Sequence, residues 1–280
     1  MKKFALVLGG GSAKGFAHIG VLKVLEKHGL KPDLIVGTSM GALVGAGYVC
    51  GNDVLDLEKI ALKFNSIGYV NLYTALFKDN VISIGKIKKT LDKMIGTKKI
   101  EELPIKYVAV ATELNTGKEY LFTEGDLVTA VLASTSMPAV FPRVKIGQNY
   151  YCDGGLVNNL AEDVARRIMP DAVIVSVDVI GDYAKQVEKM RIKSIETILN
   201  ACTLMTTNVI KNRKQDADIR IEISQPHISQ MDFRKENVEK SIKKGENITR
   251  KYVQQIKDLL GIKGEKNVVN TRDKKKSKKN

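Results

Sequence analysis

One serine lies inside a pentapeptide whose residue types suit nucleophilic chemistry. Residues 37–41 read Gly-Thr-Ser-Met-Gly, which fits the pattern G-x-S-x-G of a nucleophile elbow, where the serine occupies a sharp turn between a strand and a helix. An apolar run, residues 34–36, precedes the turn, and a small, apolar segment, residues 42–49, follows it. We therefore take Ser39 as a candidate nucleophile, with Gly37 and Gly41 leaving room for the strained backbone. The alternative is a structural turn built of small residues.

A glycine-rich turn follows the first apolar run of the chain. Residues 9–15 read Gly-Gly-Gly-Ser-Ala-Lys-Gly and lie between the apolar residues 4–8 and a helical pattern that ends near Gly29. Such a turn at a helix N-terminus directs several backbone N–H groups to one point and can bind an anion. The spacing excludes a Walker A motif and does not fit a dinucleotide-binding fingerprint.

An oxyanion hole explains this turn better than a phosphate site does. Acyl transfer develops negative charge on an oxygen, and one preorganised N–H donor is worth roughly 3 kcal/mol there. We assign the amides of Gly10 and Gly11 as donors, with that of Met40 as a third. Lys14 either adds positive potential or is an exposed cation at the start of the helix. The remaining residues that support the motif are Gly9, Ser12 and Gly15.

The serine needs a base, and an aspartate is the strongest candidate. Asp153 precedes Gly154 and Gly155 at the end of an apparent hairpin, where glycines allow close approach to another backbone turn. A simple Asp-Gly turn is the alternative. The histidines at positions 18, 28 and 227 have no compelling catalytic setting. A Ser/His/acid esterase that uses His227 stays open as an alternative, motivated by the order of serine, acid and histidine in α/β-hydrolases.

Four stretches in this order resemble the bacterial patatin-like phospholipases. They are the glycine turn with residues 16–22, the serine pentapeptide, residues 133–142 (Ala-Ser-Thr-Ser-Met-Pro-Ala-Val-Phe-Pro) and residues 153–159 (Asp-Gly-Gly-Leu-Val-Asn-Asn). The resemblance spans Leu8 to Asn159 and continues more loosely to about residue 230. Two positions depart from the pattern: Ser12 stands where many relatives have glycine, and Ala161 where many have proline.

This resemblance implies an α/β protein with the three-layer α/β/α patatin-like fold and a mainly parallel central sheet. It implies hydrolysis of fatty-acyl esters of phospholipids or lysophospholipids through an acyl-enzyme on Ser39, with Asp153 as base and no metal or organic cofactor. An aspartate is a weak base near neutral pH, so the site must raise its proton affinity by desolvation. In residues 133–142, the apolar side chains either line an acyl-chain pocket or cover the core; they are Met137, Val140 and Phe141.

The length of 280 residues, 44% of them hydrophobic, suits one catalytic domain. We predict that it covers residues 1–260, with the motifs in 4–160 and a C-terminal helix over about 235–260. Residues 261–280 hold eight basic and two acidic residues and predict a disordered tail. A segment near residues 70–84 is a candidate lid. Further predicted strands lie at residues 107–112, 119–122, 144–146, 149–152, 172–179 and 219–223, and predicted helices at 53–64, 85–95, 127–134, 161–168 and 192–210.

The net charge of +14 offers a different class of function. A basic surface attracts phosphate-rich partners, so a lipid- or nucleic-acid-binding scaffold with a vestigial hydrolase site is the alternative. Nucleic acid is not an expected partner, because no aromatic residues alternate with the lysines of the tail. Three scattered cysteines and the lack of an apolar run of roughly 20 residues favour a cytoplasmic protein in peripheral contact with an anionic membrane. Residue types do not reveal the oligomeric state.

Overall fold

The computed structural model describes residues 2–63, 84–138, 140–181, 194–213, 215–229 and 231–262. The candidate lid, apart from Ile84, and the tail beyond residue 262 lie outside these ranges, so both stay predictions, as does the domain boundary at residue 260. Among the described residues, no helix has the length and apolar character that a membrane span requires.

One central sheet organises the fold, with the strand order β5-β6-β3-β2-β1-β7-β8 and β4 paired to β3. Strands β1, β2, β3, β7 and β8 run parallel to one another, whereas β4, β5 and β6 are antiparallel to their neighbours. The strands are β1 (Phe4–Leu8), β2 (Leu34–Thr38), β3 (Lys106–Glu113), β4 (Lys118–Phe122), β5 (Val144–Ile146), β6 (Asn149–Asp153), β7 (Val173–Asp178) and β8 (Ile219–Glu222).

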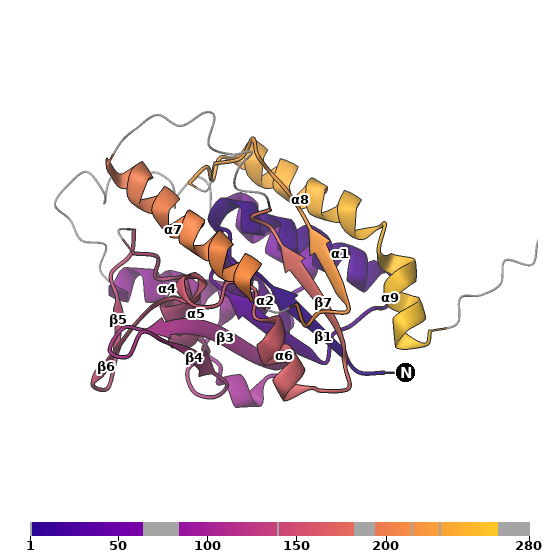
Figure 1. Ribbon diagram of the computed structural model, residues 1–280, viewed down its shortest axis with the longest axis horizontal. Helices are drawn as coiled ribbons and strands as arrows, with labels where there is room; N and C mark the ends of the chain where they lie inside the picture. The colour runs from indigo at the N-terminus through magenta and orange to yellow at the C-terminus, as the bar shows by residue number, and fades with distance from the viewer. Residues whose placement is uncertain are drawn as a thin grey trace, which may run out of the picture.

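The parallel strands consist of apolar runs because helices cover both faces of the sheet. Successive side chains of β1 alternate between two cores: Phe4 and Leu6 belong to the larger one, and Ala5 and Val7 to the smaller one on the other face. Residues 173–175 in β7 divide in the same way. This arrangement, shown in Figure 1, confirms the predicted three-layer α/β/α architecture with its mainly parallel sheet.

The helices lie near the predicted ranges. They are η1 (Ser12–Phe16), α1 (Ala17–Lys27), α2 (Met40–Val49), a segment over residues 54–63, α4 (Ile84–Ile95), η2 (Ile100–Glu102), α5 (Leu127–Thr135), η3 (Gly154–Leu156), α6 (Glu162–Ile168), α7 (Ser194–Asn212), α8 (Lys235–Thr249) and α9 (Val253–Leu260). Side chains of α1, α2, α5, α8 and α9 enter the larger core, and those of α6 the smaller one.

The prediction of a single C-terminal helix over about 235–260 is wrong, because the segment forms two helices. Between α8 and α9, the N–H groups of Lys251 and Tyr252 donate to carbonyls three residues earlier, at Ile248 and Thr249. This tighter turn interrupts the α-helical ladder and lets the buried side chains of both helices reach the core. A repeat of apolar residues at helical spacing does not reveal such a change of direction.

Helix α8 runs alongside α1, with two glycines at the contact (Figure 1). A Cβ on Gly20 would lie 2.0 Å from the carbonyl oxygen of Ile242, and one on Gly245 would lie 2.1 Å from that of Ala17. The two backbones therefore approach more closely than any other residue type allows. This contact fixes α1, the helix that follows the glycine turn, against the C-terminal part of the chain.

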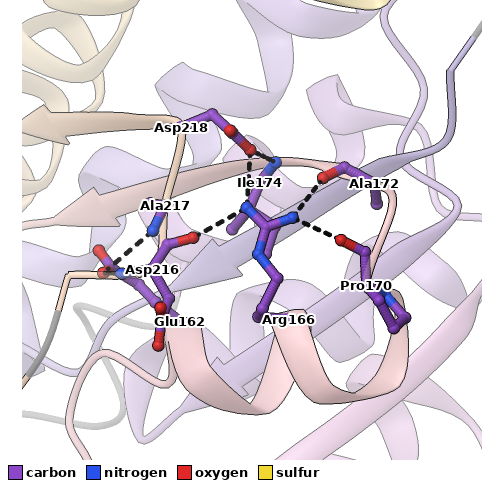
Figure 2. A network of polar contacts seen from close by, with 8 residues as sticks. All are labelled: Glu162, Arg166, Pro170, Ala172, Ile174, Asp216, Ala217 and Asp218. Carbon is purple, nitrogen blue, oxygen red and sulfur yellow. Dashed lines mark hydrogen bonds and ion pairs between the residues drawn. The ribbon is translucent and has the colours of Figure 1, made fainter.

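A network of polar contacts joins α6 to β7 and to the segment before β8 (Figure 2). The guanidinium of Arg166 donates to the carbonyl oxygens of Pro170, Ala172 and Asp216 and to the carboxylate of Asp218. Asp218 in turn accepts the N–H of Ile174 at 2.8 Å. One side chain thus satisfies several loop carbonyls at this edge of the molecule, which is a structural role.

The register of three adjacent strands places Ser39 and Asp153 at the same level of the sheet. Thr38, the last residue of β2, pairs with Val110 of β3, so Ser39 comes level with Ala111. Ala111 also pairs with Asp153, the last residue of β6. The two candidate residues therefore face each other across the width of β3, although 114 positions separate them in the chain.

Candidate active site

Ser39 occupies a strained turn between β2 and α2. Its φ of 53° and ψ of −122° are unusual for a residue with a side chain, which is the backbone signature of a nucleophile elbow. A Cβ on Gly41 would lie 2.1 Å from the carbonyl oxygen of Leu8, so only glycine fits where the turn crosses the end of β1. Close packing of these backbones holds the serine in its strained conformation.

Ser39 and Asp153 are hydrogen-bonded. The Ser39 hydroxyl donates to Oδ2 of Asp153 at 2.6 Å, and the other carboxylate oxygen, Oδ1, accepts the N–H of Gly155 at 2.8 Å. Ser39 is 9% exposed and Asp153 5% exposed. The structure thus brings together the two residues that the sequence analysis singled out, in a place from which most water is excluded.

Burial makes Asp153 a better proton acceptor. Desolvation raises its pKa from 3.8 to about 6, and the hydrogen bonds from Ser39 and from the Gly155 amide oppose this shift without cancelling it. At neutral pH the carboxyl is therefore still ionised and able to accept a proton. Its affinity for that proton is higher than that of an exposed aspartate.

Residues 134–136, at the end of α5, hold the backbone at both Ser39 and Asp153. The hydroxyl of Ser134, which is fully buried, accepts the N–H of Ser39 at 2.9 Å and donates to the carbonyl of Val110 at 2.6 Å. The carbonyl of Ser136 accepts the N–H of Asp153 at 3.0 Å. One short segment therefore positions both members of the pair.

Asn159 fixes the glycine turn from two sides. The N–H of Gly10 donates to the backbone carbonyl of Asn159, and the side-chain amide of Asn159 donates to the carbonyl of Gly10, both at 3.2 Å. The prediction that Gly10 donates to an oxyanion is therefore wrong in this structure, because its N–H is already bonded. In a trans peptide the N–H points opposite to the C=O, so Asn159 directs the N–H of Gly11 away from its own amide.

Gly11 and Met40 are the predicted donors that keep this role as a proposal. Gly11 lines the same cleft as Ser39. Met40 is the first residue of α2, where backbone N–H groups have no partner within the helix. Ser12 also lines the cleft and has a positive φ of 50° without being glycine, a strained conformation directly beside the candidate donors.

Two ionisable side chains are buried at the glycine turn, one from α1 and one from the turn itself. His18 is fully buried, and its Nε2 lies 2.7 Å from the carbonyl oxygen of Gly9, so this nitrogen carries a hydrogen and donates. Burial lowers the pKa of His18 to about 4, which keeps the ring neutral. Lys14 is 1% exposed, so the expectation of an exposed cation is wrong; burial lowers its pKa to about 8, and the charge of Asp178 opposes this.

A narrow cleft opens above the pair. Besides the residues named above, its lining includes Met137, Pro138 and Leu156, together with Cys202, Thr203 and Thr206 from the inner face of α7. The predicted acyl pocket is corrected in part: Met137 lies in the cleft, whereas Val140 and Phe141 pack against the larger core. A separate apolar hollow is lined by Met40 and by other side chains that include Phe16, Leu43 and Leu57.

His227 lies away from this site. It is exposed in the turn after Gln225 and is not part of the cleft lining, whereas the Ser39 hydroxyl is already bonded to a carboxylate. Within the part of the chain that the structure describes, no group of His, Cys, Asp and Glu side chains is arranged to hold a metal ion.

Ser134, Asn159 and His18 had no predicted role, although each belongs to one of the four motifs. Ser134 belongs to residues 133–142, Asn159 to residues 153–159 and His18 to residues 16–22. Their positions were visible in the sequence, but their hydrogen-bond partners lie in other motifs and emerge only from the fold.

Comparison with known proteins agrees with this geometry. Residues 6–166 match the family model described as patatin-like phospholipase. The match covers more than half of the chain, and the chain belongs to this family.

Two relatives in sequence are longer than the part of them that aligns with this chain. An uncharacterized NTE family protein of Mycobacterium tuberculosis is 34% identical over 162 residues, which are 56% of this chain and 44% of that protein. Lysophospholipase nte1 of Aspergillus fumigatus is 31% identical over 188 residues, 65% of this chain and 12% of that protein. The chain thus spans less than half the length of these relatives. The crystal structure of VipD from Legionella pneumophila has the same fold, with a TM-score of 0.50 and 14% identity over 91% of this chain and 67% of that one.

Proposed function

We propose that this chain is a serine acyl hydrolase that cleaves fatty-acyl esters of phospholipids or lysophospholipids. Ser39 is the nucleophile and Asp153 the base. The observation that carries the proposal is the 2.6 Å hydrogen bond from the Ser39 hydroxyl to Oδ2 of Asp153, made in a cleft where both side chains are buried. Membership of the patatin-like phospholipase family supports a lipid ester as the substrate.

In the first half of the reaction, Oγ of Ser39 forms a bond to the acyl carbon while its proton passes to Asp153. The carbonyl π electrons move onto the oxygen, where the N–H groups of Gly11 and Met40 stabilise the charge. The intermediate then expels the alcohol, which takes the proton from Asp153. An acyl-enzyme ester on Ser39 remains.

In the second half, water attacks the acyl carbon and gives a proton to Asp153. The tetrahedral intermediate releases the fatty acid, and the proton returns to Oγ of Ser39. The raised pKa of Asp153 suits both transfers, because a carboxylate with a pKa of about 6 is a stronger base than an exposed aspartate, and its protonated form is still acidic enough at neutral pH to return the proton. Both halves of the proposed reaction use side chains and backbone amides of the protein, together with water.

The apolar hollow that Met40 lines supports a fatty-acyl substrate. Its lining consists of apolar side chains and a glycine, and Met40 directly follows the candidate nucleophile. Apolar hollows beside a few polar groups are the usual form of small-molecule sites. The name of the fungal relative, a lysophospholipase, agrees with this substrate class.

Labelling with a fluorophosphonate probe tests the proposal, because the probe reacts with activated serines. We expect the label on the peptide that contains Ser39 and turnover of a short p-nitrophenyl ester by the wild type. Ser39→Ala and Asp153→Asn should abolish turnover while thermal unfolding stays cooperative. Asp33→Asn, outside the cleft, is the matched control and should keep full activity.

Two results would overturn the assignment. Full ester turnover by Ser39→Ala would exclude this nucleophile, and a label on another residue would locate the chemistry elsewhere. His227→Ala should stay active; its inactivation, with Asp153→Asn unimpaired, would instead favour the Ser/His/acid alternative.

A further inference from the structure

Helix α7 is amphipathic, but its orientation is opposite to that of a usual surface helix, because an apolar face is exposed. Its inner face carries Thr203, Thr206 and Thr207, which are 4%, 7% and 5% exposed. Its outer face carries Ile198, Leu204 and Met205, which are 46%, 45% and 57% exposed. Between residues 198 and 207, three large apolar side chains thus face solvent, whereas three hydroxyl groups face the protein.

The outer residues form one continuous stripe. Positions 198, 201, 205 and 208 recur at intervals of three and four, and 204 lies between two of them, so they share a face of the helix. The members are Ile198, Ala201, Leu204, Met205 and Asn208, all exposed. Among the described residues, six large hydrophobic side chains are exposed, and three of the six belong to this stripe.

The inner face covers the candidate active site. Cys202, Thr203 and Thr206 line the cleft that holds Ser39 and Asp153. The hydroxyl of Thr206 donates to the carbonyl of Gly155 at 3.0 Å, two residues from the base. Figure 1 shows α7 in orange, apart from the pair formed by α1 and α8. One helix therefore carries the site on one side and an apolar stripe on the other.

The net charge of the chain favours an anionic lipid surface as the partner of this stripe. The sequence of α7 holds one acidic residue, Glu196 in its first turn, and Lys211 lies in its last turn; Arg213, directly after the helix, is paired with Asp163 at 3.1 Å. The whole chain carries a net charge of +14. An apolar stripe on a basic protein combines the two terms that bind an amphipathic helix to an anionic bilayer, which are apolar burial and attraction to headgroups.

We infer that the outer face of α7 docks on the surface of a bilayer that contains anionic phospholipid, which holds the cleft, on the opposite face of the same helix, close to its substrate. A second copy of the chain is the less suitable occupant, because three half-exposed side chains provide far less than the roughly 800 Å² per partner of a standard interface. The role of this docking in catalysis rests on the proposed hydrolysis of lipid esters, whereas vesicle binding is measured independently of that activity.

A tryptophan placed in the stripe gives a direct readout, since the natural chain contains none. Met205→Trp and the control Leu114→Trp are each prepared with Ser39→Ala, so that no lipid is consumed. Leu114 is 45% exposed in the turn after β3 and is not part of the cleft lining. On addition of phosphatidylglycerol vesicles, we expect a blue shift of the emission of Trp at position 205 and none at position 114.

A second pair of variants tests whether the stripe carries the binding. Leu204→Asp with Met205→Asp should lower partition into these vesicles by about tenfold or more. The matched control is Leu55→Asp with Leu114→Asp, whose side chains are equally exposed, at 53% and 45%, and it should bind like the wild type. Thermal unfolding checks that each variant folds. If the aspartate variant of α7 does not fold, the tryptophan variant provides the test.

Several results would overturn the inference. They are a lack of vesicle binding by the wild type, equal shifts at both tryptophans, equal binding by both aspartate pairs, or a wild-type dimer that only the α7 variant dissociates. Vesicle binding without ester turnover would refute the proposed function and leave the docking face intact. Turnover of a soluble ester without a shift at position 205 would do the opposite.

Discussion

The raised pKa of Asp153 predicts a specific dependence of stability on pH. The carboxyl has a pKa of about 6 in the folded protein, against an ordinary value of 3.8. A raised carboxyl pKa means that the folded state binds the proton more tightly than the unfolded chain does. Ionisation of Asp153 therefore costs nothing well below pH 3.8, becomes destabilising as pH rises, and reaches its full cost above pH 6.

The magnitude follows from the two pKa values. By proton linkage, the cost is about 1.6 kcal/mol at pH 5 and about 3 kcal/mol at pH 8. Other carboxyls shift in the opposite direction; the pKa of Asp33, for example, is lowered by its hydrogen bonds despite partial desolvation. The wild type alone therefore does not isolate Asp153, but a difference between variants does.

The assay compares the wild type with Asp153→Asn by urea unfolding at pH 5 and pH 8. The amide is neutral at both values, so the stability of the variant relative to the wild type should rise by about 1.4 kcal/mol between them. Ser39→Ala keeps the carboxyl and removes a hydrogen bond that lowers its pKa, so its own pH-dependent loss should be at least as large as that of the wild type. The value of kcat/KM for a short ester should rise with pH with a midpoint near 6.

A difference that stays flat from pH 5 to pH 8 would refute this reasoning, because it would mean that burial does not perturb Asp153. A kinetic midpoint near 4 would lead to the same conclusion. Retention of the kinetic midpoint near 6 in Asp153→Asn would assign it to another group.

Three further predictions concern groups that support the site and the fold. Ser134→Ala leaves the buried N–H of Ser39 without its acceptor, which costs about 1–3 kcal/mol of stability. The variant should lower kcat about tenfold with little change in KM. The control Thr135→Val removes a neighbouring hydroxyl whose hydrogen bonds lie within α5, and it should stay active. Gly20→Ala forces α1 and α8 apart and should destabilise the protein by about 1–3 kcal/mol in urea unfolding, and an unchanged midpoint would contradict the close backbone contact. Arg220→Met leaves Glu162, which is 1% exposed, without its cation; unfolding should show a loss of about 3 kcal/mol that Glu162→Gln in the same chain partly restores, whereas equal losses in the single and double variants would refute the coupling.

The elements that bury apolar runs were predictable from the sequence. Strands β1, β2 and β7 consist of residues whose side chains are buried on both faces of the sheet, and glycine turns mark where two of these strands end. Ser39 was predictable from its pentapeptide between an apolar run and a small-residue helix, whereas its pairing with Asp153 came from the resemblance of four ordered motifs to a known family. The break between α8 and α9 was not, since both helices continue the same apolar spacing.

The finer parts of the site depend on contacts that no local pattern encodes. The direction of the Gly10 amide is set by Asn159, which lies 149 positions away, so the donor assignment required the fold. Val140 and Phe141 have the same apolar character as Met137, but only Met137 lines the cleft. Burial of Lys14 likewise reflects residues of α8 and the segment before it, not the sequence of its own turn.

The support that Lys14 receives shows how much chain a working site needs. Its carbonyl oxygen accepts hydrogen bonds from the side chains of Gln225 and Ser241, at 2.9 and 3.0 Å, whereas the family match ends at residue 166. A fragment trimmed to the matched motifs would retain every candidate reacting group but lose the brace behind the first loop. Grafts or minimal versions of this domain should therefore extend through α8, because the matched motifs lack the hydrogen bonds that hold the first loop.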